Sequence, residues 1–344
     1  MIGSKTIIFC GPSDFGFSDI IKSELQQQGF TVYDFPISDT RYKYKRFSER
    51  LLNIYKKTIL RDYAYKRKLK MAERNRTLTR KLKRVSHADY ALFIRPDLFP
   101  LRFVENVKSK VDKIVGYQWD GLQRFPEVAD YIDLFDRFFV FDAEDLASKK
   151  GLLPLTNFFI EKTIPEIEQK SAYFIASYDD YRFELIKKIK EILDSEKVDS
   201  QLYLITPEDK QIQNLQNAGL PIEEPLTYQE NIERVEKASI LVDIHSPIHS
   251  GLSFRVFEAL NYNKKLITTN RGVRNYDFYH PNNIFIWDTT SSEGIADFLK
   301  AELVETPYEI KHKYSFSNWI SYVLDIGDYS AIELSNCRQS QLSL

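Results

Sequence analysis

The sequence has few cysteines and no long hydrophobic run. Its 344 residues include only 2 Cys, and Cys10 and Cys337 lie far apart in unlike contexts. This spacing argues against a fold held by disulfides and favours a reducing, cytosolic location. No apolar run approaches the ~20 residues that cross a bilayer, so we expect no transmembrane helix. Met1 leads directly into a strand-like run without a basic region, so we expect no signal peptide.

Signatures of a metal site or a dinucleotide cofactor are also missing. The glycine-containing turn at residues 11–16 does not complete a G-x-G-x-x-G fingerprint, so a dinucleotide is poorly supported. His245 and His249 are four residues apart, which on a helix would place two metal ligands on one face. Pro247 between them argues against a helix, and no third ligand is evident. We therefore predict no metal and no cofactor.

Net charge is close to zero over the whole chain, but one segment is strongly basic. The formal net charge is −1, yet residues 41–84 hold 18 Lys and Arg against 3 acids, a net of +15 that leaves −16 elsewhere. Apolar residues recur there at helical spacing, at Phe47, Leu51, Ile54 and Tyr55, which predicts one long helix or a helical pair.

Three partners fit the charge of this segment. The basic residues can form the solvated face of a core-packed helix, or they can contact anionic lipid or a lipid-pyrophosphate acceptor. Nucleic acid also fits the charge. No known DNA- or RNA-binding module accompanies the segment, so we expect no nucleic acid.

Alternating strand and helix signals predict an α/β protein with two domains. Residues 6–10, a helix over 17–28 ended by Gly29, and residues 31–35 form a β-α-β opening. Further strand-like runs follow at 90–94, 113–117, 137–141, 171–177, 201–205, 239–243, 265–269 and 283–287. We predict domains over 1–160 and 171–312, a C-terminal helical segment over 313–328 and a flexible tail over 329–344.

The stretch over residues 239–288 carries the clearest chemical pattern. A short apolar run ends at Asp243, a loop and a helical pattern follow, and a second apolar run ends before Asn270. In such a strand–loop–helix–strand unit, the loop lies where parallel sheets present ligand sites. We interpret Asp243 as a buried, hydrogen-bonded residue at the strand end.

The loop of this unit has the composition of an anion site. Ser250, Gly251 and Ser253 can place unblocked backbone N–H groups at a helix N-terminus, which attracts phosphate. Arg255 follows within the first turn, where its guanidinium can reach the same oxygens. Glu258 lies one turn further on, at the distance expected for a carboxylate that accepts from ribose hydroxyls. A helix with ordinary capping and a surface ion pair is the alternative.

The sequence of this unit resembles a known family. Gly251-Leu-Ser-Phe-Arg-Val-Phe-Glu-Ala-Leu, followed by Lys264-Lys-Leu-Ile-Thr-Thr-Asn270 and Tyr276-Asp-Phe-Tyr-His-Pro-Asn-Asn-Ile284, is similar to the donor-binding half of GT-B glycosyltransferases. Bacterial lipopolysaccharide and capsule transferases, including CgeB-like proteins, are the members it looks most like. The resemblance implies two Rossmann-like domains that face each other across a cleft, with residues 41–84 as a helical insertion and a C-terminal helix that crosses back onto the first domain.

The resemblance also implies roles for residues of the site. It implies diphosphate contact for Gly251 and Arg255 and ribose contact for Glu258. Many retaining members carry another Glu where Ser250 and Gly251 stand here, which leaves inversion or retention open. The donor-binding residues that we predict are His249, Ser250, Gly251, Arg255, Glu258, Thr269 and Asn270. For Thr269 and Asn270, capping of the next turn is the alternative.

Glycosyl transfer needs a base for the acceptor and positive charge for the leaving diphosphate. Asp120 is our first choice for the base, because it follows a strand and neighbours Trp119, whose ring suits a sugar. Asp14, after the first strand, is the second candidate, and Asp97 with Trp119 is predicted to bind acceptor. For each aspartate a turn or cap role is the alternative.

Two other positions could assist the leaving group. Lys264 and Arg271 flank the second apolar run and could supply positive charge for the departing diphosphate. The sequence contains no Asp-x-Asp, the metal-holding signature common in GT-A transferases, which favours metal-independent transfer.

Together these patterns predict a cytosolic, metal-independent glycosyltransferase that uses a nucleotide-sugar donor. Its acceptor would be a lipopolysaccharide, capsule or related glycan, free or lipid-linked, at the inner face of the membrane, with an anionic membrane surface contacted through residues 41–84. Two alternatives remain. One is a non-catalytic GT-B-like subunit that binds nucleotide-sugar or glycan as a scaffold, and the other is a membrane-surface or nucleic-acid adaptor that depends on residues 41–84.

Overall fold

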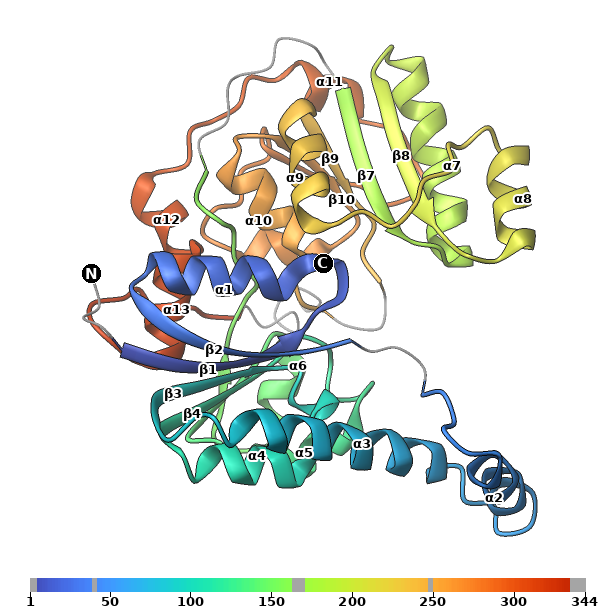
Figure 1. Cartoon of the computed structure of the whole chain (residues 1–344). Helices are drawn as coiled ribbons and strands as arrows, with labels where there is room; N and C mark the ends of the chain where they lie inside the picture. The colour runs from blue at the N-terminus through green and yellow to red at the C-terminus, as the bar shows by residue number, and fades with distance from the viewer. Residues whose placement is uncertain (1–4, 39–41, 163–170, 247–249, 335–344) are drawn as a thin grey trace. The chain divides into compact units, whose positions relative to one another are not determined.

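The computed structural model describes residues 5–38, 42–162, 171–246 and 250–334, which fold as two compact units (Figure 1). Unit 1 spans Met1–Val140 and Gly151–Leu153, and unit 2 spans Phe141–Lys150 and Pro154–Leu344. The division therefore falls earlier than the predicted boundary at residue 160. The chain enters unit 2 at Phe141, directly after a strand of the first sheet.

The first sheet has six strands in the order β2-β1-β3-β4-β5-β6. They are β1 (Lys5–Pro12), β2 (Phe30–Ile37), β3 (Ala88–Ile94), β4 (Val111–Gln118), β5 (Arg137–Val140) and β6 (Leu152–Pro154). β1 pairs in parallel with β2 and β3, β3 with β4, and β4 with β5. Residues 7–10 of β1 are fully buried, as expected for a parallel strand that is covered on both faces.

Helices cover both faces of this sheet (Figure 1). The helices of unit 1 are α1 (Phe17–Gln27), α2 (Phe47–Thr58), α3 (Tyr65–Leu82), α4 (Leu101–Lys108) and α5 (Ala129–Ile132), with 3-10 turns η1 (Asp14–Gly16), η2 (Pro96–Leu98) and η3 (Pro126–Val128). α2 does not cover the sheet and packs against α3. α1 lies on one face, and α3 and α4 lie on the other. Gly29, with φ of 95°, follows the C-cap of α1, as the sequence predicts.

The basic segment forms a helical pair whose members differ in their packing. Leu78 and Leu82 of α3 are buried, so the second half of this helix is core-packed. α2 contributes no buried residue. The interpretation of residues 41–84 as a core-packed helix with a charged face thus holds for α3 and is wrong for α2.

The second sheet has five strands in the order β11-β10-β9-β7-β8, and all of its pairs are parallel. Its strands are β7 (Ser171–Ser177), β8 (Asp199–Ile205), β9 (Ile240–Asp243), β10 (Lys265–Thr268) and β11 (Ile284–Ile286). The helices of unit 2 are α6 (Ala143–Leu146), α7 (Asp180–Ser195), α8 (Asp209–Asn217), α9 (Tyr228–Lys237), α10 (Phe254–Asn261), α11 (Ile295–Lys300), α12 (Tyr308–Lys313) and α13 (Phe316–Leu324), with the 3-10 turn η4 (Arg271–Asn275).

Two hydrophobic cores cover the two faces of the second sheet. Alternate residues of β7 enter different cores, with Ala172 and Phe174 in one and Tyr173 in the other. The first core is completed by α7, α8 and α11, and the second by α9, α10 and residues near Tyr314. The α/β class with two parallel sheets, which the sequence predicts, is therefore confirmed.

The C-terminal helix α13 is an integral part of unit 2. Trp319 is fully buried, and its Nε1 donates to the carbonyl oxygen of Thr156 at 3.1 Å. The chain after α13 is also held in place, because the Asn318 amide exchanges hydrogen bonds of 2.9 and 2.7 Å with the backbone of Ser330. Ile332 is fully buried. The predicted flexible tail therefore does not begin at residue 329, and residues 335–344 lie outside the described part of the chain.

Several helices escaped the sequence analysis. They are α4, α8 and α12, which have eight, nine and six residues respectively. Among the helices of the described residues, none is long and apolar enough to cross a membrane.

Candidate functional site

The carboxyl ends of β9 and β10 are joined by the buried carboxylate of Asp243. Its Oδ1 accepts from Ser253 Oγ and its Oδ2 accepts from Thr268 Oγ1, each at 2.8 Å. Asp243 lies opposite Thr268 in the strand register, so the contact follows directly from the pairing of the two strands. This confirms the interpretation of Asp243 as a hydrogen-bonded residue at the strand end.

Helix α10 begins beside this carboxylate. It starts at Phe254 with Ser253 as its N-cap, and not at Gly251 as the sequence analysis expected. Because the Ser253 hydroxyl donates to Asp243, no side-chain hydrogen bond caps the helix. The first turn therefore retains the partial positive charge that attracts an anion.

The loop before α10 is held by Phe141 and Asp142, which follow β5. Asp142 Oδ2 accepts from the backbone N–H of Ser250 at 2.8 Å, and Oδ1 accepts from the Ser250 hydroxyl. The expectation of an unblocked N–H at Ser250 is therefore wrong. At Gly251 an added Cβ would lie 2.1 Å from the Phe141 ring, so the position requires glycine for a close approach.

Asp142 is a residue of the site that the sequence analysis did not select. In the sequence it follows a strand-like run directly and begins a helical turn, and it does accept from the Glu144 N–H at 3.0 Å as the N-cap of α6. Its second role, toward Ser250, joins segments 108 residues apart, and no local pattern predicts such a contact.

Arg255 lies in the first turn of α10 and reaches back to β7. Its Nη2 donates to the carbonyl oxygen of Ile175 at 2.6 Å, its Nη1 lies 4.0 Å from Asp243 Oδ1, and its guanidinium lies 5.0 Å from the centroid of the Phe174 ring. Its Nε–H is buried and has no hydrogen-bond partner among the residues that the structure describes. The guanidinium is thus oriented by three contacts and retains an unused donor.

Glu258 lies one turn after Arg255 and is almost fully buried. Burial raises the pKa of its carboxyl from 4.5 to about 7; Arg255 opposes this shift and Asp243 adds to it. A buried carboxyl one turn from a guanidinium with an unused donor is typical of a ligand site and unusual for a packing residue.

Thr269 and Asn270 follow β10, and their side chains bind protein groups. Thr269 Oγ1 accepts from the N–H of His245 at 2.8 Å. Asn270 caps η4 by accepting from Gly272 N–H at 2.9 Å, and its Nδ2 lies 3.2 Å from His245 Nδ1 and 3.4 Å from the carbonyl oxygen of Gly251. These contacts favour capping and loop-holding over donor contact for both residues. His249, also a predicted donor residue, lies outside the described residues.

Tyr276 and Asp277, part of the motif that resembles the family, connect to the C-terminal helices. Asp277 Oδ1 accepts from the Tyr314 hydroxyl at 2.7 Å, and Oδ2 accepts from Lys313 Nζ at 3.0 Å. The Tyr276 ring stacks on Phe278 at 5.5 Å. This part of the motif therefore holds the end of α12 and the residue that follows it.

In unit 1, two predicted acidic residues are held by one arginine. Asp97 accepts two hydrogen bonds from Arg95, from Nε at 2.8 Å and from Nη2 at 2.7 Å. Asp120 accepts hydrogen bonds from Arg95 Nη1 at 2.6 Å and from Arg124 Nη1 at 3.3 Å. Arg95 has a φ of 58°, and its guanidinium lies 4.0 Å from the centroid of the Phe125 ring. The arginine was not selected from the sequence, although it follows β3 directly.

This arrangement brings together the carboxyl ends of β3 and β4, as expected for neighbouring parallel strands. Asp14 is placed elsewhere on the same edge, at the start of η1 after β1, and accepts from Ser38 Oγ at 3.1 Å. Trp119 packs edge-on against Phe17, with ring centroids 5.0 Å apart. Arg95 thus links Asp97 to Asp120, whereas Trp119 packs against Phe17 of α1.

Lys264 lies at the amino end of β10, away from the carboxyl end where Thr268 binds Asp243. It precedes β10, is buried, and donates to the carbonyl oxygen of Glu236 at 3.1 Å. Burial lowers the pKa of its ammonium to about 8. The expectation that Lys264 assists a leaving diphosphate is therefore wrong. Lys264 lies at the amino end of β10, whereas the candidate site lies at the carboxyl ends of β9 and β10. Arg271, in η4 after β10, remains at the carboxyl edge.

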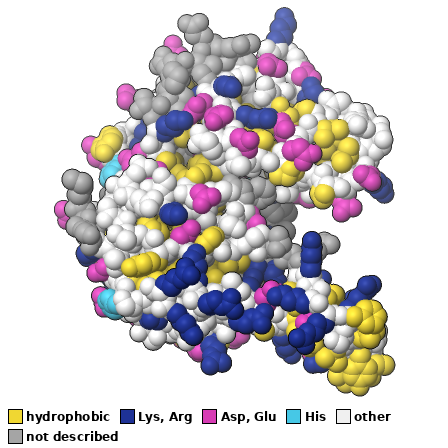
Figure 2. Space-filling model, viewed as in Figure 1, with side chains coloured by type: hydrophobic (Ala, Val, Ile, Leu, Met, Phe, Trp, Pro, Cys, Tyr) yellow, Lys and Arg dark blue, Asp and Glu magenta, His cyan; other side chains and the backbone are white. Residues whose placement is uncertain are grey.

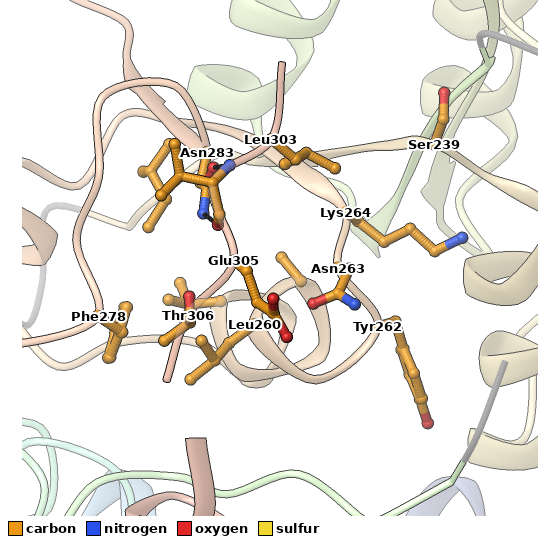
Figure 3. Close-up of a pocket in the computed structure, with 14 residues that line it drawn as sticks. Ser239, Leu260, Tyr262, Asn263, Lys264, Phe278, Asn283, Leu303, Glu305 and Thr306 are labelled. Atoms are coloured by element: carbon orange, nitrogen blue, oxygen red, sulfur yellow. Dashed lines mark hydrogen bonds between the residues drawn. The ribbon is translucent and has the colours of Figure 1, made fainter. Parts of the chain in front are cut away.

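A cavity of about 530 Å³ lies at this amino end of the strands (Figure 3). Leu260, Phe278 and Ile284 contribute apolar lining, and Asn263 and Glu305 contribute polar groups. The Asn283 side-chain amide forms hydrogen bonds of 2.7 and 2.8 Å with the backbone of Val304, in the segment between α11 and α12. The cavity is therefore separate from the candidate site around Arg255.

A metal site has no support in the described ranges, where no group of three or more His, Cys, Asp or Glu side chains could hold an ion. Within those ranges, the backbone N–H of His245 donates to Thr269 and its ring faces Asn270. Metal-independent chemistry stays a prediction.

No protein-family model and no curated protein matches the sequence. Among solved structures, the chain is similar to S. aureus TarM in complex with UDP, at 12% identity and a TM-score of 0.45, covering 61% of this chain and 48% of TarM. It is similar to the pneumococcal O-GlcNAc transferase GtfA with UDP and GlcNAc at 11% identity and a TM-score of 0.49, over 74% of this chain and 58% of GtfA. It is also similar to a UDP-N-acetylglucosamine 2-epimerase at 10% identity and a TM-score of 0.49, over 96% and 100% of the two chains.

The chain thus spans about half the length of the first two of these proteins. At identities of 10–12% and TM-scores below 0.5, the similarities assign neither a family nor a reaction to this chain.

Proposed function

We propose that this chain is a glycosyltransferase of the GT-B type that uses a nucleotide-sugar donor bound at the start of α10. One observation carries the proposal. At the carboxyl edge of the second sheet, Arg255 has a buried Nε–H with no hydrogen-bond partner among the described residues, and Glu258, one turn away, has a buried carboxyl whose pKa is raised to about 7. Both stand in the segment whose sequence resembles the donor-binding helix of GT-B enzymes.

The two groups differ in the part of the donor that each would bind. A diphosphate would accept from the Arg255 guanidinium and from the N–H groups of the uncapped first turn. Glu258 would accept from the ribose hydroxyls. Asp142 and Asp243 lie in the same cluster, and their charges are compensated by N–H and hydroxyl donors. Arg255 would thus supply positive charge for the leaving diphosphate.

For the acceptor side, we propose a base in unit 1. Asp14 and Asp120 are the candidates, and both lie at strand carboxyl ends. Asp120 accepts from two guanidinium groups, so its loss would also release Arg95 and Arg124. Asp14 accepts from the Ser38 hydroxyl. Replacement of the base by Asn should lower kcat by ~100-fold or more with little change in donor affinity.

The acceptor class and the location rest on the sequence resemblance. We place the acceptor among lipopolysaccharide, capsule or related glycans, free or lipid-linked, at the cytoplasmic face of the membrane, and we expect metal-independent transfer. A non-catalytic subunit that binds nucleotide-sugar or glycan as a scaffold is the alternative.

Donor hydrolysis separates the enzyme from the scaffold. The chain would be incubated with UDP-, GDP- and CMP-sugars, with and without a glycan acceptor extract, and release of the nucleotide would be measured. Slow release without acceptor and faster release with it are expected for one donor class. Binding of a donor without any release, in either condition, would favour the scaffold and contradict the enzyme.

A further inference from the structure

Helix α2 presents its polar stripe to the protein and its apolar stripe outward. Its partly buried residues are Glu49, Asn53 and Lys56, which share one helical face, and the helix packs against α3. All other residues of α2 are exposed, including every large apolar one. A surface helix of a globular protein normally has the reverse arrangement, with the apolar stripe toward the core.

The outward apolar side chains form one continuous patch, which we call the α2 patch. Its members are Phe47, Leu51, Leu52, Ile54 and Tyr55 of the helix, and Ile59, Leu60 and Tyr63 of the turn that follows. Figure 2 shows hydrophobic side chains gathered over α2 and bordered by Lys and Arg. Soluble proteins rarely expose such a patch unless it binds a partner.

The charge around the patch indicates the kind of partner. Residues 43–66 hold eight Lys and Arg against two acids. Both acids are engaged locally, because Glu49 accepts from the Lys45 N–H and Asp62 from the Ala64 N–H, each at 3.0 Å. The border of the patch therefore presents positive charge to the partner.

From this orientation and charge we infer that the α2 patch inserts into the interface of an anionic lipid bilayer. An interfacial helix buries its apolar face at the boundary between headgroups and acyl chains, while basic residues contact anionic headgroups. A second copy of the chain is disfavoured as occupant, because it would bring the same positive charge against this one. The inference does not depend on the proposed activity, since the patch belongs to unit 1 and the proposed donor site to unit 2.

Vesicle flotation of the full chain tests this inference. Vesicles of phosphatidylcholine alone would be compared with vesicles that also contain phosphatidylglycerol. The wild type should float with the anionic vesicles and remain behind with the neutral ones. The double variant Phe47→Ser, Ile54→Gln should partition about tenfold or more weakly, because two inserted side chains are lost.

The matched control replaces equally exposed apolar residues elsewhere. Tyr308 and Ile222 are 69% and 48% exposed, against 73% and 49% for Phe47 and Ile54. The variant Tyr308→Ser, Ile222→Gln should float like the wild type. Equal loss in both variants, or equal binding of the wild type to neutral and anionic vesicles, would overturn the inference. So would a wild-type dimer in sedimentation that the α2 variant lacks, because it would assign the patch to a second copy.

Discussion

At the scale of single residues, the titration of Glu258 gives the clearest expectation. Its pKa is raised from 4.5 to about 7 by burial, so between these values the folded protein binds this proton more tightly than the unfolded chain. Its contribution to stability is therefore complete at low pH and is lost as pH rises through this window. The loss is on the order of 3 kcal/mol at most.

The variant Glu258→Gln should lack this pH-dependent loss. Denaturant unfolding of both proteins across the window would show the wild type falling relative to the variant as pH rises. Parallel pH profiles would contradict the assignment of a buried, protonated carboxyl. If Glu258 accepts from ribose hydroxyls, nucleotide binding should also strengthen as pH rises toward about 7, since those donors favour the ionised form.

Gly251 offers a second test at the residue scale. Its replacement by Ala would put a Cβ 2.1 Å from the Phe141 ring, so the change should destabilise the protein by about 2 kcal/mol. In a Phe141→Ala background the ring is absent, and Gly251→Ala should then cost almost nothing. Thermal unfolding of the four proteins in this cycle measures the difference. Equal cost in both backgrounds would show that the glycine is needed for another reason.

Residue roles could be predicted from the sequence only where they depend on local spacing. The placement of Arg255 and Glu258 one turn apart on α10 follows from helical periodicity, and the burial of Asp243 follows from its position at the end of a short apolar run. The contact of Asp142 with Ser250 and the two-pronged contact of Arg95 with Asp97 were not predicted. They depend on strand order or on a particular backbone conformation, and neither leaves a periodic signal.

At the scale of elements, α10 and α2 show how far periodicity reaches. Both have a clear apolar stripe, and both were predicted as helices. The stripe of α10 is buried, whereas the stripe of α2 faces outward. Periodicity predicts which residues share a face, but the packing of α2 against α3 decides which face is covered.

α13 carries a large buried aromatic side chain, so it offers a test at the scale of one element. Trp319 is fully buried, and its ring packs on Phe158 and Phe316 with centroids 4.8 and 5.9 Å apart. Trp319→Ala should destabilise the protein by about 4 kcal/mol, as the loss of a buried aromatic does. Tyr308→Ala, in the neighbouring α12, removes an exposed ring and should cost little. Denaturant unfolding that gave similar losses for the two variants would contradict the placement of α13 in the core of unit 2.

At the scale of the whole molecule, each of the two α/β units has a sheet of parallel strands, and the two sheets carry different side chains at their carboxyl edges. Unit 1 presents carboxylates held by Arg95, and unit 2 presents the Arg255 and Glu258 pair. The two-unit α/β architecture follows from the order of strand and helix signals in the sequence. The passage of the chain into unit 2 at Phe141 does not, because no break in composition marks it.

Nucleotide binding at Arg255 is the central claim, and calorimetric titration with UDP, GDP and CMP tests it most directly. One of the three should bind the wild type. Arg255→Lys keeps the charge but loses the planar fork, so it should bind at least about tenfold more weakly. Arg234→Ala serves as control, because Arg234 is a partly buried arginine of α9 that pairs with Glu223. No binding by any nucleotide, or equal binding by the wild type and Arg255→Lys, would contradict the account.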